Sequence, residues 1–586
     1  MKLHGQYMRL RAHYGSTDEV SATLDELAAI LGCTHRNVLN ILGKMARQGW
    51  VAWTPSRGRG RRSLLSFIAS RDDIAVQSMM QAMERRDAVS AAMEQIRSHA
   101  GVSALQDTLQ SWLLAYSGHH AEMRKDRVID TLRLPIRQPL YTIDPLHMNL
   151  LAESFVSSHV FDGLVRRGAG SEEVLPGIAH AWETDETRTN WTFYLRKEVL
   201  LHNGAILDAS DVVYSFSRLT RTPQGRLYSF ILRDILEVRA LNPRTVSIRL
   251  KAPNELFLSF LCTSRAAVVP REPERTGESR LVHKPVGTGP FKIAELNREF
   301  CVLEAFPHYF QGRAHLDRVE ILHVPWDAEP PVADSGSPFH IIQNPLPEES
   351  ASLSRTHTET SVRKFITCNT KKAGPLSDPA VRAEILSCLD GINEPDGGIG
   401  ATGPDETANR AVLSGRSGSH HLSAAGKTAS FRGLSLRIAT IPQYAADAEL
   451  VAMRLARRGI SAAIVSVPPE EFKGQVRMES DLILFSLVRD RDEQLRLFDL
   501  YQTLAEHVTP QIRSEIEAGL NLIAREPDYT ARAEAFRRIE DRLIQERELH
   551  ILFEKPVETA YLPSVRGVRF NSQGWIDLRH VWFPQQ

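Results

Sequence analysis

Apolar side chains recur at helical spacing in two short segments near the N-terminus. In "TLDELAAILG", residues 23–32, they fall on one face, Thr23 and Glu26 have the spacing of a capping box, and Gly32 favours a stop. In "CTHRNVLNILGKMARQGW", Thr34 is the expected N-cap of a second helix. Its buried stripe consists of Val38, Ile41, Leu42 and Met45. The pattern predicts two helices joined by a tight turn.

The period of the apolar positions changes after Gly49. "WVAW" and "SLLSF" are typical of two short strands, and "TPSRGRGRR" between them has the Pro and Gly of a hairpin tip. A helix-turn-helix followed by a hairpin is the pattern of a winged helix, in which the second helix enters the major groove of DNA. We therefore predict a winged helix-turn-helix domain over residues 1–70.

The polar positions of this domain suit nucleic acid. Asn pairs with adenine edges, Arg pairs with guanine edges, and Lys and wing arginines meet phosphates. Arginine-rich tips also occur in RNA-binding proteins, so RNA stays open as an alternative. The expected DNA-contacting residues are Thr34, Arg36, Asn37, Asn40, Lys44, Arg57, Arg59, Arg61 and Arg62.

Composition and charge support a nucleic-acid partner for this domain alone. The chain has a formal net charge of zero with 42% hydrophobic and 24% charged residues, which is ordinary for a globular protein. Residues 1–68, however, hold ten Lys and Arg against four Asp and Glu, a local charge of +6. The partner expected is double-stranded DNA.

Several classes of function are disfavoured. Charged side chains interrupt residues 1–20, and no later stretch approaches about 18 uninterrupted apolar residues, so we expect a cytoplasmic protein without membrane insertion. The five cysteines lack CxxC spacing and are expected to be buried free thiols, and the histidines lack metal-motif spacing. No paired nucleophile and base is evident, so we expect no metal, no cofactor and no enzyme activity.

The remaining chain divides into a connector and a large body. Residues 71–126 begin with a segment rich in Ala, Met, Gln and Glu that predicts a helical connector. From residue 127 to 586 strands and helices alternate, as in an α/β body. Residues 391–433 are rich in Gly and Ser, which predicts a mobile insertion. A strand, helix, strand unit with parallel pairing follows, and there we expect the second lobe to begin.

The N-terminal segment resembles a known family. "HGQYMRLRAHYG" and "LDELAAILGCTHRNVLNILGKMARQGWVAWTPSRGRGRRSLLSF" are similar to the N-terminal domain of the SgrR family of bacterial transcription regulators. The "RN" of the second helix, the "GW..W" and the "GRG" carry the likeness. The resemblance implies DNA binding and regulation of transcription in response to sugar-phosphate stress.

The body resembles a second family. "NLLAESFVSSHVFDGLVRR", "KPVGTGPFKIAEL" and "RAEAFRRIEDRLIQERELHILFEKPVETAYLPSVRGVRF" are similar to family 5 extracellular solute-binding proteins, which bind oligopeptides, dipeptides or nickel. "GTGPF" lacks the GK[ST] ending of a phosphate loop, so we expect a tight structural turn there. The resemblance implies a multidomain protein with an α/β periplasmic-binding-protein-like body (type II, two-lobed) that closes on a ligand between its lobes.

The ligand anchors follow from this second resemblance. Peptide-binding members hold the ligand's amino terminus with an Asp after a strand of the second lobe, and in "DLILFSLVRDRDEQL" this place is taken by Asp490. Arg489 and Arg491 flank it and would instead suit an anion such as a sugar phosphate. A surface charge cluster is a further alternative. We take Asp490 and Arg489 as the expected ligand-binding residues.

The two resemblances together predict a ligand-responsive transcriptional regulator. Its effector would be a sugar phosphate or a peptide, and a homodimer stays an open alternative. The competing function is a peptide- or solute-binding protein of an ABC transporter that has kept a DNA-binding-like N-terminus.

Overall fold

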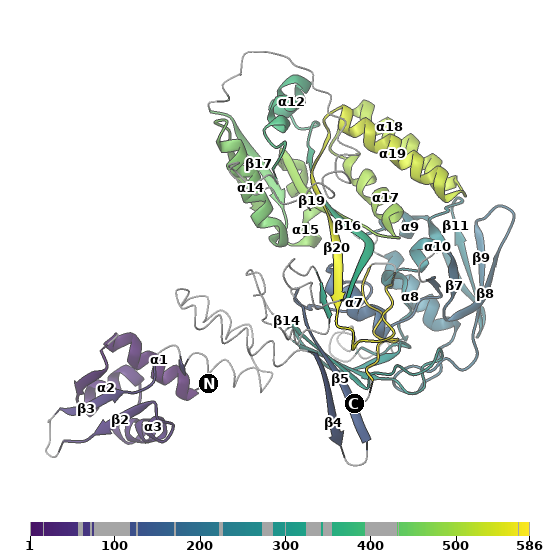
Figure 1. The fold of residues 1–586 in the computed structure, drawn as a ribbon. Coiled ribbons are helices and arrows are strands. Elements are labelled where there is room, and N and C mark those ends of the chain that lie inside the picture. Colours follow the sequence, from purple (N-terminus) through teal and green to yellow (C-terminus); the bar gives the residue numbers. More distant parts are fainter. Residues whose placement is uncertain are drawn as a thin grey trace.

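The computed structural model describes residues 2–15, 17–56, 62–70, 73–74, 118–124, 127–136, 138–168, 172–221, 227–271, 285–298, 300–323, 341–343, 354–392, 431, 433–571 and 574–584. Three units are described: an N-terminal domain and two lobes of a body (Figure 1). The predicted insertion lies almost wholly outside these residues, as do residues 75–117 of the predicted connector.

The N-terminal domain is a winged helix. The two predicted helices and the predicted hairpin are confirmed, and the strands form a sheet of order β1-β3-β2. The capping box is present, with Glu26 N–H donating to Thr23 Oγ1 at 3.2 Å, and Gly32 ends the first helix at φ 61°. Its elements are α1 (Lys2–Tyr14), β1 (Glu19–Ala22), α2 (Leu24–Leu31), α3 (His35–Arg47), β2 (Val51–Thr54) and β3 (Ser63–Phe67).

Two of these elements, α1 and β1, were not predicted from the periodicity. Tyr7 and Leu10 of α1 are fully buried in the domain's core, and Tyr7 donates its hydroxyl to the carbonyl of Ala69 at 2.5 Å. Arg11 joins the end of α1 to the loop before β1 through an ion pair with Asp18 at 3.0 Å. The first helix therefore completes the core that α2 and α3 leave open.

The boundary at residue 126 needs a correction. Residues 118–124, which the sequence analysis placed in the helical connector, form strand β4 (Gly118–Arg124). This strand pairs antiparallel with β5 (Arg127–Ile136). The body therefore begins at residue 118, because the ladder with β5 supplies backbone hydrogen bonds that a separate connector would lack.

The described residues of the first lobe lie between 118 and 323 and between 565 and 583. It holds a five-stranded sheet of order β12-β13-β14-β5-β4, in which only β14 and β5 are parallel, and a four-stranded antiparallel sheet of order β10-β11-β9-β8. Its further elements are α7 (Leu151–Val160), β6 (Val165–Arg167), β7 (Val174–Pro176), β8 (Ala179–Thr184), β9 (Asn190–Leu195), α8 (Ala209–Arg221), α9 (Ser229–Asp234), β10 (Ile235–Asn242), β11 (Thr245–Leu250), α10 (Phe257–Leu261), η1 (Ser264–Ala266), β12 (Phe291–Leu296), β13 (Phe300–Ala305) and β14 (Arg318–His323).

The described residues of the second lobe lie between 341 and 561. Its sheet has the order β15-β20-β16-β19-β17-β18. The predicted parallel pairing of β17 with β18 is confirmed, but β15 and β16 precede the insertion, so this lobe begins earlier than expected. Its elements are β15 (Ile341–Gln343), β16 (Ser354–Cys368), η3 (Pro375–Ser377), α12 (Pro379–Ser387), β17 (Ser435–Thr440), η4 (Pro442–Tyr444), α14 (Ala445–Ala456), β18 (Ser461–Ser466), α15 (Pro469–Phe472), α16 (Gln475–Glu479), β19 (Leu482–Arg489), α17 (Glu493–Leu504), α18 (Pro510–Arg525), α19 (Tyr529–Gln545) and β20 (Leu549–Tyr561).

The two lobes pack against each other through α9 and α17, which lie side by side in Figure 1. Phe230 of α9 stacks on Phe498 of α17 with ring centroids 4.0 Å apart. Tyr228 donates its backbone N–H to Asp499 at 2.9 Å. One apolar core therefore continues from the first lobe into the second.

The "GTGPF" segment is a tight structural turn, as predicted. A Cβ at Gly287 would lie 2.0 Å from the carbonyl oxygen of Val160, and one at Gly289 would lie 2.6 Å from that of His159. Only glycine permits this approach to the end of α7, and Pro290 of the same turn lines the cavity described below.

All five cysteines are free, as predicted, but only Cys301 and Cys368 are buried, whereas Cys33, Cys262 and Cys388 are partly exposed. No helix among the described residues is both long enough and apolar enough to cross a bilayer.

Candidate functional site

The helix α3 has two distinct faces. Val38, Ile41, Leu42 and Met45 are buried against the rest of the domain. The opposite face is exposed, and its polar side chains make no ion pair or hydrogen bond with one another within the described residues. The residues predicted to contact DNA from this face are Thr34, Arg36, Asn37, Asn40 and Lys44. His35 at the start of α3 pairs with Asp25 at 2.8 Å. Exposed polar side chains of this kind are the ones that a recognition helix uses to meet base edges and phosphates.

The wing is described only at its base. Arg57, Arg59 and Arg61 lie outside the described residues. Arg62 is exposed, but its guanidinium pairs with Glu26 at 2.7 Å, and its Nε donates to the carbonyl of Ser21 at 3.1 Å. Arg62 therefore connects the hairpin to α2 and to β1 in addition to its predicted role toward DNA.

A cavity of about 200 Å³ lies between the lobes of the body. It receives residues from the end of α7 and from β6, from the segment after α10, from the C-terminal segment and from the loop after β19. The charged and titratable side chains that line it are His159, Asp162, Arg166, Arg167, Cys262, Tyr309, Asp492, Arg569, Asp577, Arg579 and His580.

The first-lobe acids of the cavity are held by neighbouring donors. Asp162 accepts hydrogen bonds from Thr288 Oγ1 and Tyr309 Oη, both at 2.9 Å. Burial nonetheless raises the pKa of the Asp162 carboxyl. Asp577 pairs with Arg579 at 3.0 Å, and that guanidinium lowers the pKa of Asp577 against the opposing effect of burial.

His159 is held as a neutral imidazole at the cavity. Leu578 N–H donates to its Nε2 at 3.1 Å, so the ring proton lies on Nδ1, which donates to the carbonyl of Phe155 at 2.8 Å. Burial lowers the pKa of His159. This side chain therefore joins α7 to the C-terminal segment and adds no charge. Within the described residues no group of three or more His, Cys, Asp or Glu side chains is arranged to hold a metal ion.

An ion pair lines the cavity on its second-lobe side. Arg167 of β6 reaches Asp492, which directly precedes α17, with an Nη2–Oδ1 distance of 3.3 Å. Both side chains are almost fully buried, and Arg167 also pairs with Glu172 at 3.0 Å. A buried pair of this kind joins the lobes in one relative position, because its partners would be costly to separate.

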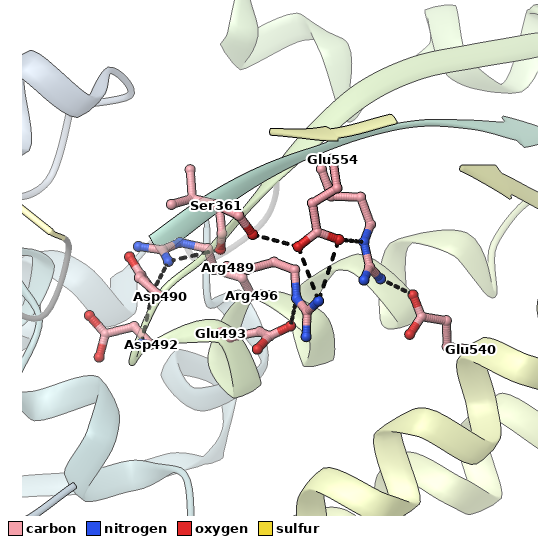
Figure 2. Close-up of polar contacts among 10 residues, drawn as sticks. Ser361, Arg489, Asp490, Asp492, Glu493, Arg496, Glu540 and Glu554 are labelled. Carbon is pink, nitrogen blue, oxygen red and sulfur yellow. Dashed lines mark hydrogen bonds and ion pairs between the residues drawn. The ribbon is translucent and has the colours of Figure 1, made fainter. Parts of the chain in front are cut away.

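Figure 2 shows where the two predicted ligand anchors lie. The side chain of Asp490 is fully buried and pairs with Arg496 of α17, and it also accepts the backbone N–H of Asp492 at 2.8 Å. Arg489 pairs with Glu493 and, at 3.2 Å, with Glu554 of β20. Neither residue lines the cavity, so their role toward a ligand stays a prediction.

Asp492, two residues beyond Asp490, is the second-lobe acid that reaches the cavity. Sequence reasoning missed it and the cavity arginines. A strand-end acid is a recognisable signal, but "RDRD" offers two of them and the sequence alone does not distinguish which one turns toward the other lobe.

Two family profiles match the chain. The profile described as "Sugar transport-related sRNA regulator N-term" matches residues 2–120. The profile described as "Bacterial extracellular solute-binding proteins, family 5 Middle" matches residues 173–390.

Curated relatives match over the whole length. An uncharacterized protein, YhjP of Bacillus subtilis, is 26% identical over 606 residues and covers 100% of both chains. The HTH-type transcriptional regulator SgrR of Yersinia pestis is 25% identical over 590 residues, which cover 99% of this chain and 98% of the relative.

Solved structures resemble the body. The periplasmic binding protein DppA of Helicobacter pylori, in complex with the peptide STSA, superposes with a TM-score of 0.62 at 18% identity, covering 78% of this chain and 98% of that one. NikA of Brucella suis, in complex with Fe(III)-EDTA, superposes with a TM-score of 0.60 at 19% identity, covering 78% and 100%. These likenesses establish the two-lobed binding-protein fold of the body.

Proposed function

Because the chain is an SgrR-like protein, with an SgrR-type N-terminal domain joined to a family 5 solute-binding body, we propose that it regulates transcription by binding DNA and sensing a small molecule. The observation that carries this proposal is the face of α3. Its apolar side is used by the core, and its exposed side offers Asn and Arg for bases and Lys for phosphates. A domain that only joined parts of the chain would not need this combination of exposed Asn, Arg and Lys side chains on one helix.

The body supplies the sensing function. Its cavity is lined by the first lobe and, from the second lobe, by Asp492, so a ligand that contacts Asp492 together with first-lobe groups responds to the separation of the lobes. The effector predicted from the sequence is a sugar phosphate or a peptide, and we assign its binding site to this cavity. We place the protein in the cytoplasm with its DNA, and a homodimer would match a two-fold operator.

The regulator is favoured over a transport receptor by the relatives that match along the full length. The transcriptional regulator SgrR of Yersinia pestis aligns with the N-terminal domain as well as the body, whereas DppA and NikA align with 78% of the chain. A transport receptor has no use for a DNA-binding face. SgrR is a regulator, and DppA is a periplasmic binding protein, and we propose no catalytic role for this chain.

The test is genome-wide mapping of DNA bound in cells, followed by binding of the purified full chain to the mapped sites. A few sharp sites are expected, with a log–log salt slope of about −0.9 per neutralised phosphate. No sharp site under any growth condition, or binding that ignores salt, would contradict the proposal.

Two matched substitutions on α3 test the division of labour. Asn40→Ala should cost roughly 1 to 3 kcal/mol on the specific site and little on random DNA, because a base contact is lost. Lys44→Ala should weaken both alike and flatten the salt slope, because a phosphate contact is lost. Equal behaviour of the two variants in competition gel shifts would show that α3 does not read sequence.

A further inference from the structure

The cavity between the lobes has more positive than negative side chains. Four arginines line it against three aspartates. Each aspartate already accepts hydrogen bonds from the protein, as described above for Asp162 and Asp577 and for Asp492 with Arg167. The positive charge therefore exceeds what the lining itself neutralises.

The excess lies at Arg166 and Arg569. Both line the cavity and are exposed to solvent, and within the described residues no acid lies in ion-pair distance of either one. Burial and the nearby guanidinium of Arg579 both lower the pKa of Arg166. The guanidinium groups of Arg166 and Arg579 repel each other, and an anion bound between them would relieve that repulsion.

The buried arginines have free donors as well. The Nε atoms of Arg167 and Arg579 are buried and have no hydrogen-bond partner in the part of the chain that the structure describes. An unsatisfied buried donor costs free energy unless another group accepts from it. Guanidinium donors match the geometry of carboxylate and phosphate oxygens.

The same cavity offers little to a peptide's amino terminus. An ammonium group needs an unpaired carboxylate, and the three aspartates of the lining are engaged. Asp490, the expected anchor, is held by Arg496 away from the cavity. The cavity volume of about 200 Å³ is also below roughly 300 Å³, the lower end of the range for pockets that hold drug-sized ligands.

We propose that this cavity binds a small anion carrying a phosphate or carboxylate group, held by Arg166, Arg569 and Arg579. The assignment of this anion as the effector rests on the proposed regulatory function, but its binding does not. The neutral His159 and the ion pair from Arg167 to Asp492 form the walls around the arginines.

The experiment uses the full chain at constant ionic strength. Its melting temperature is measured with each probe, and the binding of each probe is measured by titration calorimetry. The probes are inorganic phosphate and succinate, which distinguish the two sources of anionic oxygen, with chloride, glycerol and the dipeptide Ala-Ala as comparisons. At least one of phosphate and succinate should raise the melting temperature above the value in chloride, because it binds the folded state. A rise with Ala-Ala alone, or with none of the probes, would overturn the proposal.

The variants Arg166→Gln and Arg569→Gln, made together, should weaken binding of the active anion by about tenfold or more, since charge-assisted contacts are lost. Both side chains are exposed, so the double variant should fold, and its melting temperature in chloride verifies this. Arg244→Gln removes an exposed first-lobe charge outside the cavity and should bind like the wild type. Unchanged affinity in the double variant would also overturn the proposal.

DNA binding is measured on the same preparations. A chain that binds its mapped DNA sites but neither anion refutes this inference and leaves the proposed function standing. A chain that binds the anion through these arginines but no DNA refutes the proposed function and leaves the cavity assignment standing.

Discussion

At the scale of single residues, His202 shows how burial couples stability to pH. Gly287 N–H donates to its Nδ1 at 3.2 Å, and Nε2 lies 3.0 Å from the carbonyl oxygen of Gly289. The ring is therefore neutral, with its proton on Nε2, and it ties a first-lobe loop to the glycine turn beside the cavity. Burial lowers the pKa of His202 to about 4.

The prediction for His202 concerns acid stability. The folded state takes up this proton only near pH 4, but the unfolded state does so near its ordinary value of 6.5, so acid favours unfolding. The contribution of neutral His202 to the free energy of unfolding is fully present above about pH 6.5. As the pH falls from 6.5 to 4, this contribution decreases by about 1.4 kcal/mol per pH unit. In urea unfolding, His202→Gln should flatten the pH dependence in this window, and a curve parallel to the wild type would contradict it.

Asp490 leads to a different residue-scale prediction from the one that the sequence suggests. Its side chain is fully buried against Arg496, whose own side chain is 12% exposed. Asp490→Ala leaves that guanidinium unpaired and should lower the free energy of unfolding by about 3 to 5 kcal/mol. Asp541→Ala, at an exposed position of α19, should change it little. A stable Asp490→Ala variant that loses only ligand binding would return Asp490 to the binding site.

At the scale of elements, helix α19 ends with a residue in a conformation that suits glycine. Arg547 has φ 59° directly after the cap residue Glu546, and its N–H donates to the carbonyl of Ile544 at 3.0 Å. Arg547→Gly should raise the free energy of unfolding by about 0.5 to 1 kcal/mol, because a Cβ is strained there. Arg537→Gly, within the same helix, should lower it by about 1 kcal/mol. Chemical denaturation measures both, and a destabilised Arg547→Gly variant would contradict this account.

At the scale of the whole molecule, regulation requires that the ligand and the DNA influence each other. The lobes share a core at Phe230 and Phe498 and an ion pair at the cavity, so a ligand there can favour one lobe arrangement. A small molecule that raises the melting temperature of the full chain should change operator affinity by about 5- to 150-fold.

Thermodynamic linkage requires that the coupling between DNA and the small molecule be reciprocal. Saturating operator DNA must change the affinity for the small molecule by the same factor, which titration calorimetry measures against gel shifts of the same samples. The N-terminal domain has its own buried core and serves as the control, since its DNA affinity should not respond to the molecule. Unequal factors, or a response of the isolated domain, would show that the body is not the sensor.

The sequence by itself determined the local elements of the N-terminal domain. The apolar stripe of α3, the capping box of α2 and the hairpin strands follow from periods and caps within a few residues, and all are present in the structure. The two-lobed body was predicted in a different way. Several long segments of the body resemble the sequences of family 5 solute-binding proteins, and that resemblance implied the fold. The free cysteines also followed from their scattered spacing.

Only the tertiary structure decided which of the charged residues meet. The cavity joins residues near 162, 264, 492 and 579, and such distant segments come together through sheet order and lobe packing that no local period encodes. The same holds for Asp490 and Asp492, since neighbouring loop acids differ only in whether Arg496 or Arg167 lies opposite. Strand β4 was likewise missed, because its evidence is a ladder with β5 rather than a pattern of its own. Local interactions depend on residues that are close in the sequence. Burial and charge pairing depend instead on which distant residues the fold places beside a given side chain.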